Sequence, residues 1–138
     1  MRGCEGNVSE MFVSFQGEGL HAGRRHLFVR LGGCPLRCRY CDTPGSLVPA
    51  AECRILGPDG ERRRANPFTP AEVETEIRAL VAAAPPLAAL AVTGGEPLAQ
   101  TDFLIAWLEM RTGELPVLLE TAGILPVRLE RLLPHVAI

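Results

Sequence analysis

The sequence predicts an α/β fold built on a parallel sheet, and three observations support this. Apolar segments of strand length alternate with helical segments three times or more along the chain, which implies right-handed strand–helix–strand units. A glycine-rich loop or turn follows three of the predicted strands, at residues 32–33, 94–95 and 121–123. Because ligands of such sheets bind at the carboxyl ends of the strands, we expect these loops to converge on one edge.

Length and composition narrow the class of protein further. A chain of 138 residues predicts a single domain, 1–138, and 47% apolar residues suffice for a packed core. The net charge of −2 argues against a nucleic-acid partner. With no secretory segment and no long apolar run, we expect a soluble, cytoplasmic protein without a membrane partner. Five cysteines, three of them clustered, favour metal ligation in a reducing compartment over disulfides.

The first elements are two strands. The apolar part of residues 8–20 predicts a short strand that runs into Gln16-Gly17-Glu18-Gly19, a loop whose glycines permit a close approach of the backbone to a ligand. Residues 26–31 predict a second strand, covered on both faces. Arg30 interrupts its apolar pattern. Its side chain is predicted either to reach a site at the strand's end or to extend to the sheet rim.

Residues 44–68 are interpreted as an inserted β-hairpin. The turn Gly57-Pro58-Asp59-Gly60 separates arms near 52–56 and 61–65. The arginines at 62–64 are interpreted as its solvated face. Cys53, in the hairpin, and Cys4, in the N-terminal tail, are interpreted as inert small residues rather than ligands.

The remaining segments alternate between helix and strand. Thr69 as N-cap, Pro70 at the first helical position and Glu72 as the partner in a capping box predict a helix start. Its expected inner face comprises Val73, Ile77, Leu80, Val81 and Ala84. The predicted elements that follow are a strand at 88–93, a helix at 101–111, a strand at 116–120, a helix at 126–133 and the beginning of a strand at 135–138.

The chemistry concentrates in a motif of three cysteines, Cys34-x3-Cys38-x2-Cys41. Three thiolates suit a four-iron cluster with one open iron, whereas a closed structural zinc site needs four ligands. No fourth cysteine or histidine lies at ligand spacing nearby. A zinc knuckle and a chance clustering of thiols are the alternatives.

An ordered set of motifs supports a more specific interpretation. Gln16-Gly17-Glu18-Gly19, the cysteine motif ending in Cys41-Asp42-Thr43, Thr93-Gly94-Gly95-Glu96-Pro97 and Glu120-Thr121 follow one another along the chain. Together they resemble the 7-carboxy-7-deazaguanine synthases (QueE) of the radical S-adenosylmethionine (SAM) superfamily. The resemblance implies a partial parallel β/α barrel of the radical SAM type with an inserted hairpin. Because family members are longer, it also implies a chain truncated at its C-terminal end.

The same resemblance implies a function. These enzymes are lyases of queuosine and 7-deazapurine biosynthesis, and they convert 6-carboxy-5,6,7,8-tetrahydropterin to 7-carboxy-7-deazaguanine with loss of ammonia. The implied cofactors are a [4Fe-4S] cluster, SAM and Mg²⁺. The implied partners are the pterin substrate, a flavodoxin or ferredoxin as electron donor, and a second copy in a homodimer.

Residue roles follow from the resemblance, position by position. The cluster ligands would be Cys34, Cys38 and Cys41, and the Mg²⁺ ligand would be Thr43. The residues that line SAM would be Tyr40, Cys41, Asp42, Gly95 and Glu96. The residues that contact the pterin would be Phe15, Gln16, Gly17, Arg30 and Thr93. Arg30 suits the substrate carboxylate, because guanidinium and carboxylate pair through two parallel hydrogen bonds.

Other interpretations stay open beside these. Thr43 could satisfy a backbone group, Glu96 could cap a helix, Tyr40 could be a packing residue, and Glu18 could be a turn residue or a substrate contact. At the level of function, the alternatives are a glycyl-radical-enzyme activase of the same superfamily and a non-enzymatic metal-binding module.

Overall fold

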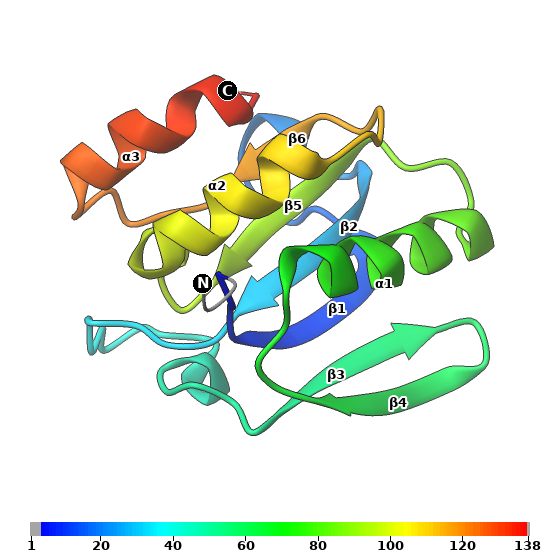
Figure 1. Ribbon diagram of the computed structural model, residues 1–138, viewed down its shortest axis with the longest axis horizontal. Coiled ribbons are helices and arrows are strands. Elements are labelled where there is room, and N and C mark those ends of the chain that lie inside the picture. Colours follow the sequence, from blue (N-terminus) through cyan, green and yellow to red (C-terminus); the bar gives the residue numbers. More distant parts are fainter. Residues whose placement is uncertain (1–3, 138) are drawn as a thin grey trace.

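The computed structural model describes residues 4–137 and shows helices on one side of a six-stranded sheet (Figure 1). The strands are β1 (Val8–Phe15), β2 (Arg25–Leu31), β3 (Glu52–Gly57), β4 (Gly60–Ala65), β5 (Ala89–Gly94) and β6 (Val117–Leu119). The α-helices are α1 (Pro70–Ala83), α2 (Thr101–Met110) and α3 (Pro126–Leu132). Short 3₁₀ turns are η1 (Gly19–His21), η2 (Pro44–Ser46), η3 (Pro97–Gln100) and η4 (Leu133–His135).

The sheet order is β4-β3-β1-β2-β5-β6. β2, β5 and β6 run parallel, as the alternation of strands and helices predicts, and β3 is parallel to β1. β1 is antiparallel to β2, because the connection over residues 16–24 is too short for a crossover helix. The expected α/β class is confirmed, with a mixed rather than an all-parallel sheet.

The hairpin prediction is also confirmed. β3 and β4 pair in antiparallel register around Gly57 and Gly60, and β3 adds the hairpin to the sheet beside β1. Each arginine of residues 62–64 forms an ion pair in this exposed edge strand, the first with Glu76 of α1. The insertion is therefore a continuation of the sheet and not a separate flap.

Local signals place the first helix. The Thr69 side chain accepts from the Glu72 backbone, and the Glu72 carboxylate accepts from the Thr69 backbone at 2.8 Å, which confirms the capping box. Val73, Ile77 and Leu80 are buried, but Val81 is 38% exposed, so the buried face of α1 is narrower than the sequence pattern predicts. The structure buries Glu74 instead, whose carboxylate accepts a hydrogen bond from the Trp107 indole.

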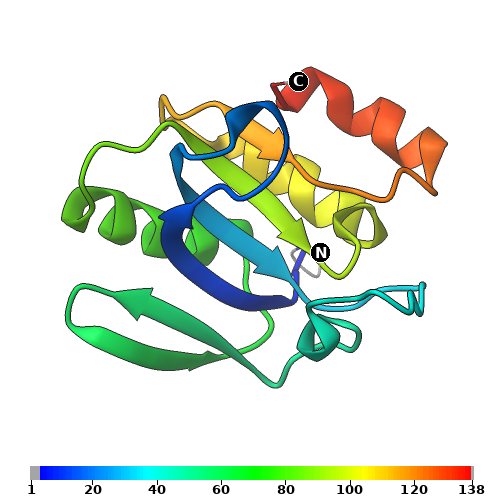
Figure 2. The same cartoon turned by 180° about the vertical axis from the view of Figure 1, so that it is seen from behind.

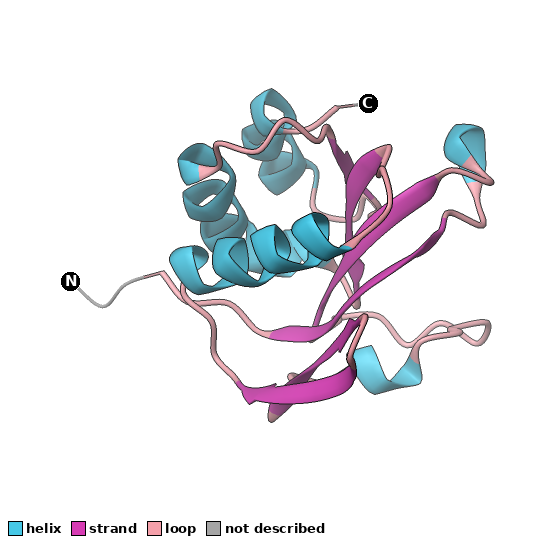
Figure 3. Cartoon of the chain, turned by 90° about the vertical axis from the view of Figure 1, so that its right-hand side faces the viewer, coloured by secondary structure: helices cyan, strands magenta, loops and turns pink. Residues whose placement is uncertain are grey.

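The two faces of the sheet differ in what covers them. The three α-helices lie on one face of the sheet (Figure 3). The large apolar core includes Leu27 and Val29 of β2 together with Phe103 and Trp107 of α2. The connection after β1 curls over the opposite face, as the view from behind shows (Figure 2). No helix among residues 4–137 is both long and apolar enough to span a bilayer. At the C-terminal end, Ala137 bridges to Leu118 of β6 in parallel, and Ile138 of the predicted last strand lies outside the described residues.

Candidate active site at the carboxyl ends of the parallel strands

Three loops that follow β2, β5 and β6 are bonded directly to one another. The backbone N–H of Gly95 donates to Leu31 at 3.0 Å, and that of Glu96 donates to Gly33 at 3.0 Å. The Glu96 carboxylate then accepts from the Thr121 hydroxyl at 2.6 Å and from the Ala122 backbone at 2.9 Å. The expected convergence of the three motif loops is thus confirmed.

Glycine is required where the first two loops touch. A Cβ on Gly95 would lie 2.2 Å from the Gly33 carbonyl oxygen and 2.5 Å from that of Ser46. Gly94 has φ +141° and its Cβ would meet the Leu31 backbone. The Gly-Gly pair therefore has a packing reason: it lets the β5 loop lie against the cysteine loop.

The three motif cysteines lie in one half-exposed loop, and each is a free thiol. Backbone hydrogen bonds from Gly33 to Ser46, at 2.8 Å, and from Cys34 to Leu47, at 3.1 Å, close the base of this loop. Within residues 4–137 no three His, Cys, Asp or Glu side chains are gathered closely enough to hold an ion. Three soft, accessible thiols on one loop still fit an iron–sulfur cluster in kind and number.

Cys53 has the properties of an inert thiol. Its side chain is fully buried in β3, and burial raises its pKa to about 12. Cys4 is partly buried against the core. Neither residue lies in the cysteine loop, in accord with the interpretation that they are not ligands.

A pocket of about 540 Å³ adjoins the end of the cysteine motif. It brings together three of the predicted site residues: Arg30 from β2, and Asp42 and Thr43 from the loop. Its other walls come from β1, η2 and the hairpin, through Ser9, Glu10, Ser46, Ala50, Ala51, Glu52, Arg54 and Arg63, with Pro44 and Gly45. The site thus lies on the face of the sheet opposite the three α-helices, which we call the helix-free face, and it extends from β2 across β1 to the strands of the hairpin.

Arg30 is held at one edge of its guanidinium. Its Nε donates to the Glu10 carboxylate at 3.0 Å, and the group lies 5.8 Å from the centre of the Phe12 ring. Its side chain is only 17% exposed. Thr93, buried on β5, is its register partner. The charge in this strand is therefore paired, as its burial requires.

The loop that contains Gln16 begins at the end of the sheet opposite the cysteine loop. The antiparallel register places Phe15 opposite Arg25, at the end of β2 away from the cysteine loop. Gln16 is nevertheless buried, and its amide donates to the Glu120 carboxylate at 2.6 Å. Beside it lies His26, whose pKa is lowered by burial and then by neighbouring positive groups. Gly17 is exposed, and Phe15 is 59% exposed.

The predicted SAM and Mg²⁺ residues differ in their surroundings. Tyr40 is 89% exposed, so it does not pack against the described chain. The Thr43 hydroxyl lies 4.0 Å from the Cys41 sulfur, at the pocket wall. Glu96 is 1% exposed, and its carboxylate is already engaged by three donors, including the Leu98 backbone at 2.9 Å. The structure thus gives the Glu96 side chain a place in the loop junction.

Two carboxylates of the site were not given roles from the sequence. Glu10 contacts Arg30, and Glu120 contacts Gln16, so each pairs with a predicted substrate residue. Glu10 carried a usable signal, since it is the sole charged residue of β1. For Glu120 the signal was its position directly after a strand of the parallel set.

Comparisons with known proteins agree with this architecture. Residues 28–136 match the model of the radical SAM superfamily. A 7-carboxy-7-deazaguanine synthase of Geobacter sulfurreducens is 37% identical over 139 residues, covering 95% of this chain and 54% of the relative. One of Methanothermobacter thermautotrophicus is 42% identical over 125 residues, covering 91% and 44%. The chain thus spans about half the length of these curated relatives.

A solved structure shares the fold. The crystal structure of QueE from Escherichia coli superposes with a TM-score of 0.53 at 22% identity, covering 86% of this chain and 53% of that one. The cysteine motif, the interlocked loops and the family match agree. The chain belongs to the radical SAM superfamily.

Proposed function

We propose that this chain is the part of a 7-carboxy-7-deazaguanine synthase that binds the cluster, SAM and the carboxylate of the substrate. The reaction would convert 6-carboxy-5,6,7,8-tetrahydropterin to 7-carboxy-7-deazaguanine with release of ammonia, in queuosine and 7-deazapurine biosynthesis. The observation that carries the proposal is the junction of the three motif loops beside the pocket that holds Arg30. The names of the relatives support the choice of reaction, and they do not favour a glycyl-radical-enzyme activase.

The cluster would be held by Cys34, Cys38 and Cys41. With SAM bound, it would supply an organic radical able to remove a hydrogen atom from the substrate. Backbone hydrogen bonds close the base of the cysteine loop. Within residues 35–40 only the Cys38 carbonyl takes part in a backbone–backbone hydrogen bond, which it accepts from the Cys41 N–H at 3.3 Å. This part of the loop has the freedom to draw the three sulfurs together around iron.

Binding of the pterin would depend on the helix-free face of the sheet. The terminal nitrogens of Arg30 would take the substrate carboxylate through two parallel hydrogen bonds. Thr93 lies beside Arg30 in register, and Gln16 with Glu120 offers an amide and a carboxylate for the polar edge of a pterin ring. Tyr40, Asp42 and the backbone of Gly95 would line SAM. Phe15, the last residue of β1, and Gly17, in the loop after it, would also contact the pterin.

We further propose that Mg²⁺ binds at Thr43. Thr43 and the neighbouring Asp42 both line the pocket, and Mg²⁺ prefers hard oxygen ligands such as a hydroxyl and a carboxylate. Thr43→Ala should lose most of the stimulation of turnover by added Mg²⁺. An equal stimulation in both proteins would remove Thr43 from this role.

The remaining parts of the proposal follow from the family resemblance. Residues 1–138 would form one radical SAM domain, the protein would act in the cytoplasm as a homodimer, and a flavodoxin or ferredoxin would deliver the electron. Cross-linking or sedimentation of the purified protein tests the dimer, and reduction of the loaded protein by each carrier tests the donor.

One experiment tests the activity. The chain is reconstituted anaerobically with iron and sulfide, given SAM, a reductant and the tetrahydropterin, and the products are identified by mass spectrometry. Because the chain spans about half the length of its curated relatives, the assay is run on this chain and on any longer native form that contains it. We expect 7-carboxy-7-deazaguanine and ammonia from the wild type of at least one of the two, and neither product nor brown cluster absorbance from Cys38→Ala in either. If both forms load fully and bind SAM but leave the pterin unchanged, the assignment is contradicted. One zinc per chain with no iron would indicate a metal-binding module instead.

A further inference from the structure

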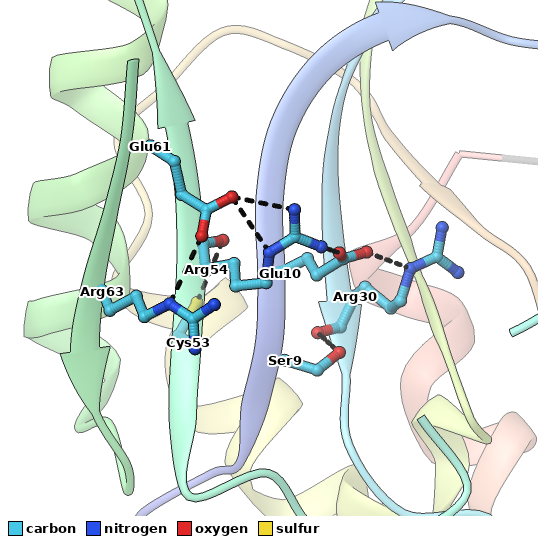
Figure 4. A network of polar contacts seen from close by, with 7 residues as sticks. All are labelled: Ser9, Glu10, Arg30, Cys53, Arg54, Glu61 and Arg63. Carbon is cyan, nitrogen blue, oxygen red and sulfur yellow. Dashed lines mark hydrogen bonds and ion pairs between the residues drawn. The ribbon is translucent and has the colours of Figure 1, made fainter. Parts of the chain in front are cut away.

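A row of alternating charges connects Arg30 to the inserted hairpin (Figure 4). Glu10 of β1 accepts from Arg30 through Oε2 at 3.0 Å and from Arg54 of β3 through Oε1 at 2.6 Å. Arg54 in turn donates through Nη2 to Glu61 of β4 at 2.9 Å, and Glu61 accepts from Arg63 at 3.3 Å. The row therefore crosses β2, β1, β3 and β4 on the face that lines the pocket.

The row becomes more buried toward Arg30. The exposed side-chain fraction is 58% at Arg63, 36% at Glu61 and 44% at Arg54, but only 25% at Glu10 and 17% at Arg30. Ion pairs in water are weak and are screened by salt, whereas hydrogen bonds to charged groups gain strength as water is excluded. The bonds to Glu10 are therefore the ones that govern the position of Arg30.

The sharing of the Glu10 carboxylate between two arginines determines which nitrogens of Arg30 stay available to a ligand. Each carboxylate oxygen of Glu10 has a different arginine partner, so Glu10 meets Arg30 only at Nε. Within residues 4–137, the terminal nitrogens of Arg30 donate no hydrogen bond, and Figure 4 shows them on the side of the guanidinium away from Glu10. If Arg54 were removed, both oxygens of Glu10 would be free to turn onto Arg30 as a two-point pair and occupy a terminal nitrogen.

We propose that the hairpin positions the residue that binds the ligand carboxylate. Arg54 of the hairpin fixes the Glu10 carboxylate, and Glu10 in turn fixes Arg30 so that both of its terminal nitrogens can bind a ligand carboxylate. Glu10 and Arg54 are thus positioning residues and specificity determinants for a carboxylated pterin. This inference rests on the proposed function for the identity of the ligand. The geometry of the row itself does not depend on it.

The binding test uses a stable, oxidised probe that needs neither cluster nor SAM. Pterin-6-carboxylate and a matched pterin without the carboxylate are titrated into the purified chain and its variants. Arg54→Gln and Glu10→Gln should each weaken binding of the carboxylate by about tenfold, the scale of one charge-assisted hydrogen bond. Binding of the uncharged pterin should be unchanged. Arg63→Gln, at the exposed end of the row, should have less than about a twofold effect.

A matched control separates positioning from damage to the hairpin. Glu76→Gln removes the ion pair that ties Arg62 of the same hairpin to α1, away from the row. It should leave the affinity for both pterins unchanged. An Arg54→Gln protein that binds the carboxylate as tightly as the wild type overturns the proposal, and so does one that loses both pterins equally.

A second measurement tests the row without any ligand. The Arg30 Nε–H signal in a ¹H–¹⁵N spectrum is identified by its loss in Arg30→Lys. In the wild type it should exchange slowly with solvent, and Arg54→Gln should shift it and speed its exchange, while Glu76→Gln should not. A signal unaffected by Arg54→Gln overturns the positioning role. If Arg54→Gln changes the Arg30 signal as expected but the wild type binds neither pterin, the proposed substrate is wrong and the positioning role of the row stands.

Discussion

Replacing Glu96 by glutamine is the sharpest test of how the site is assembled. The Glu96 carboxylate is 1% exposed and joins two loops through three donors: Leu98 and Thr121 on Oε1, and Ala122 on Oε2. The glutamine oxygen can keep the first two partners, but its NH₂ group then faces the Ala122 N–H. The buried NH₂ group of the glutamine and the partly buried Ala122 N–H then face each other as two donors without an acceptor, which costs about 1–3 kcal/mol of unfolding free energy.

Urea unfolding followed by circular dichroism measures this cost. With a slope of about 1–3 kcal/mol per molar urea, a loss near 2 kcal/mol lowers the midpoint by about 1 M. Glu109→Gln is the matched control, because Glu109 is exposed on α2 and its change should stay within about 0.5 kcal/mol. Should Glu96→Gln unfold like the wild type yet fail to bind SAM, the junction role is wrong and Glu96 is a direct cofactor contact.

Two further predictions follow from the loop contacts and from His26. Gly95→Ala places a methyl group 2.2 Å from the Gly33 carbonyl oxygen and should sharply reduce the iron bound per chain after reconstitution, whereas the control Gly45→Ala, with open space around it, should bind iron normally. If both variants bind iron fully, the loop junction is not needed for the cluster. Burial lowers the His26 pKa below its unfolded value near 6.5, so the unfolded state binds more protons and the folded state loses stability as pH falls through about 6.5. Urea midpoints at about pH 7.5 and about pH 5.5 should therefore differ less in His26→Gln than in the wild type, and equal differences would refute this contribution.

Local rules explain why much of the fold was predictable. The capping box of Thr69 and Glu72 needs only four consecutive residues, and the hairpin needs only its turn and the two arms. The convergence of the motif loops follows from parallel strand direction, so it could be inferred before any distance was known. The face of α1 was harder, because the exposure of Val81 depends on what lies over the last turn of the helix.

The roles that escaped prediction depend on partners far along the chain. Glu96 binds Thr121, 25 residues later, and Gln16 binds Glu120, 104 residues later. The pairing of Glu10 with Arg30 requires the antiparallel register of β1, which the short connection after it imposes. Sequence motifs identified most of these residues as important. They could not distinguish a side chain that contacts a ligand from one that holds a loop in place.

The segment between Arg30 and Cys34 links the proposed substrate anchor to the proposed cluster loop. Besides the ladder pairing of Leu31 in β2, its three residues, Leu31 to Gly33, take part in five hydrogen bonds of 2.8–3.0 Å. Their partners are Asn7, Ser46, Gly95, Glu96 and the Gln100 side chain. A segment of this length spans about 10 Å when extended, and bonds on all sides leave it little freedom to bend.

Radical chemistry makes this rigidity useful. A hydrogen atom is transferred only when donor and acceptor are held close and aligned, and a misplacement of about 1 Å can cost about a hundredfold in rate. The backbone sets the distance from the cluster loop to β2, and the charge row sets the direction of the Arg30 side chain. Position and direction are thus controlled by separate sets of contacts. A substitution in the hairpin should therefore alter substrate binding without altering iron content, and a substitution at Gly95 should do the reverse.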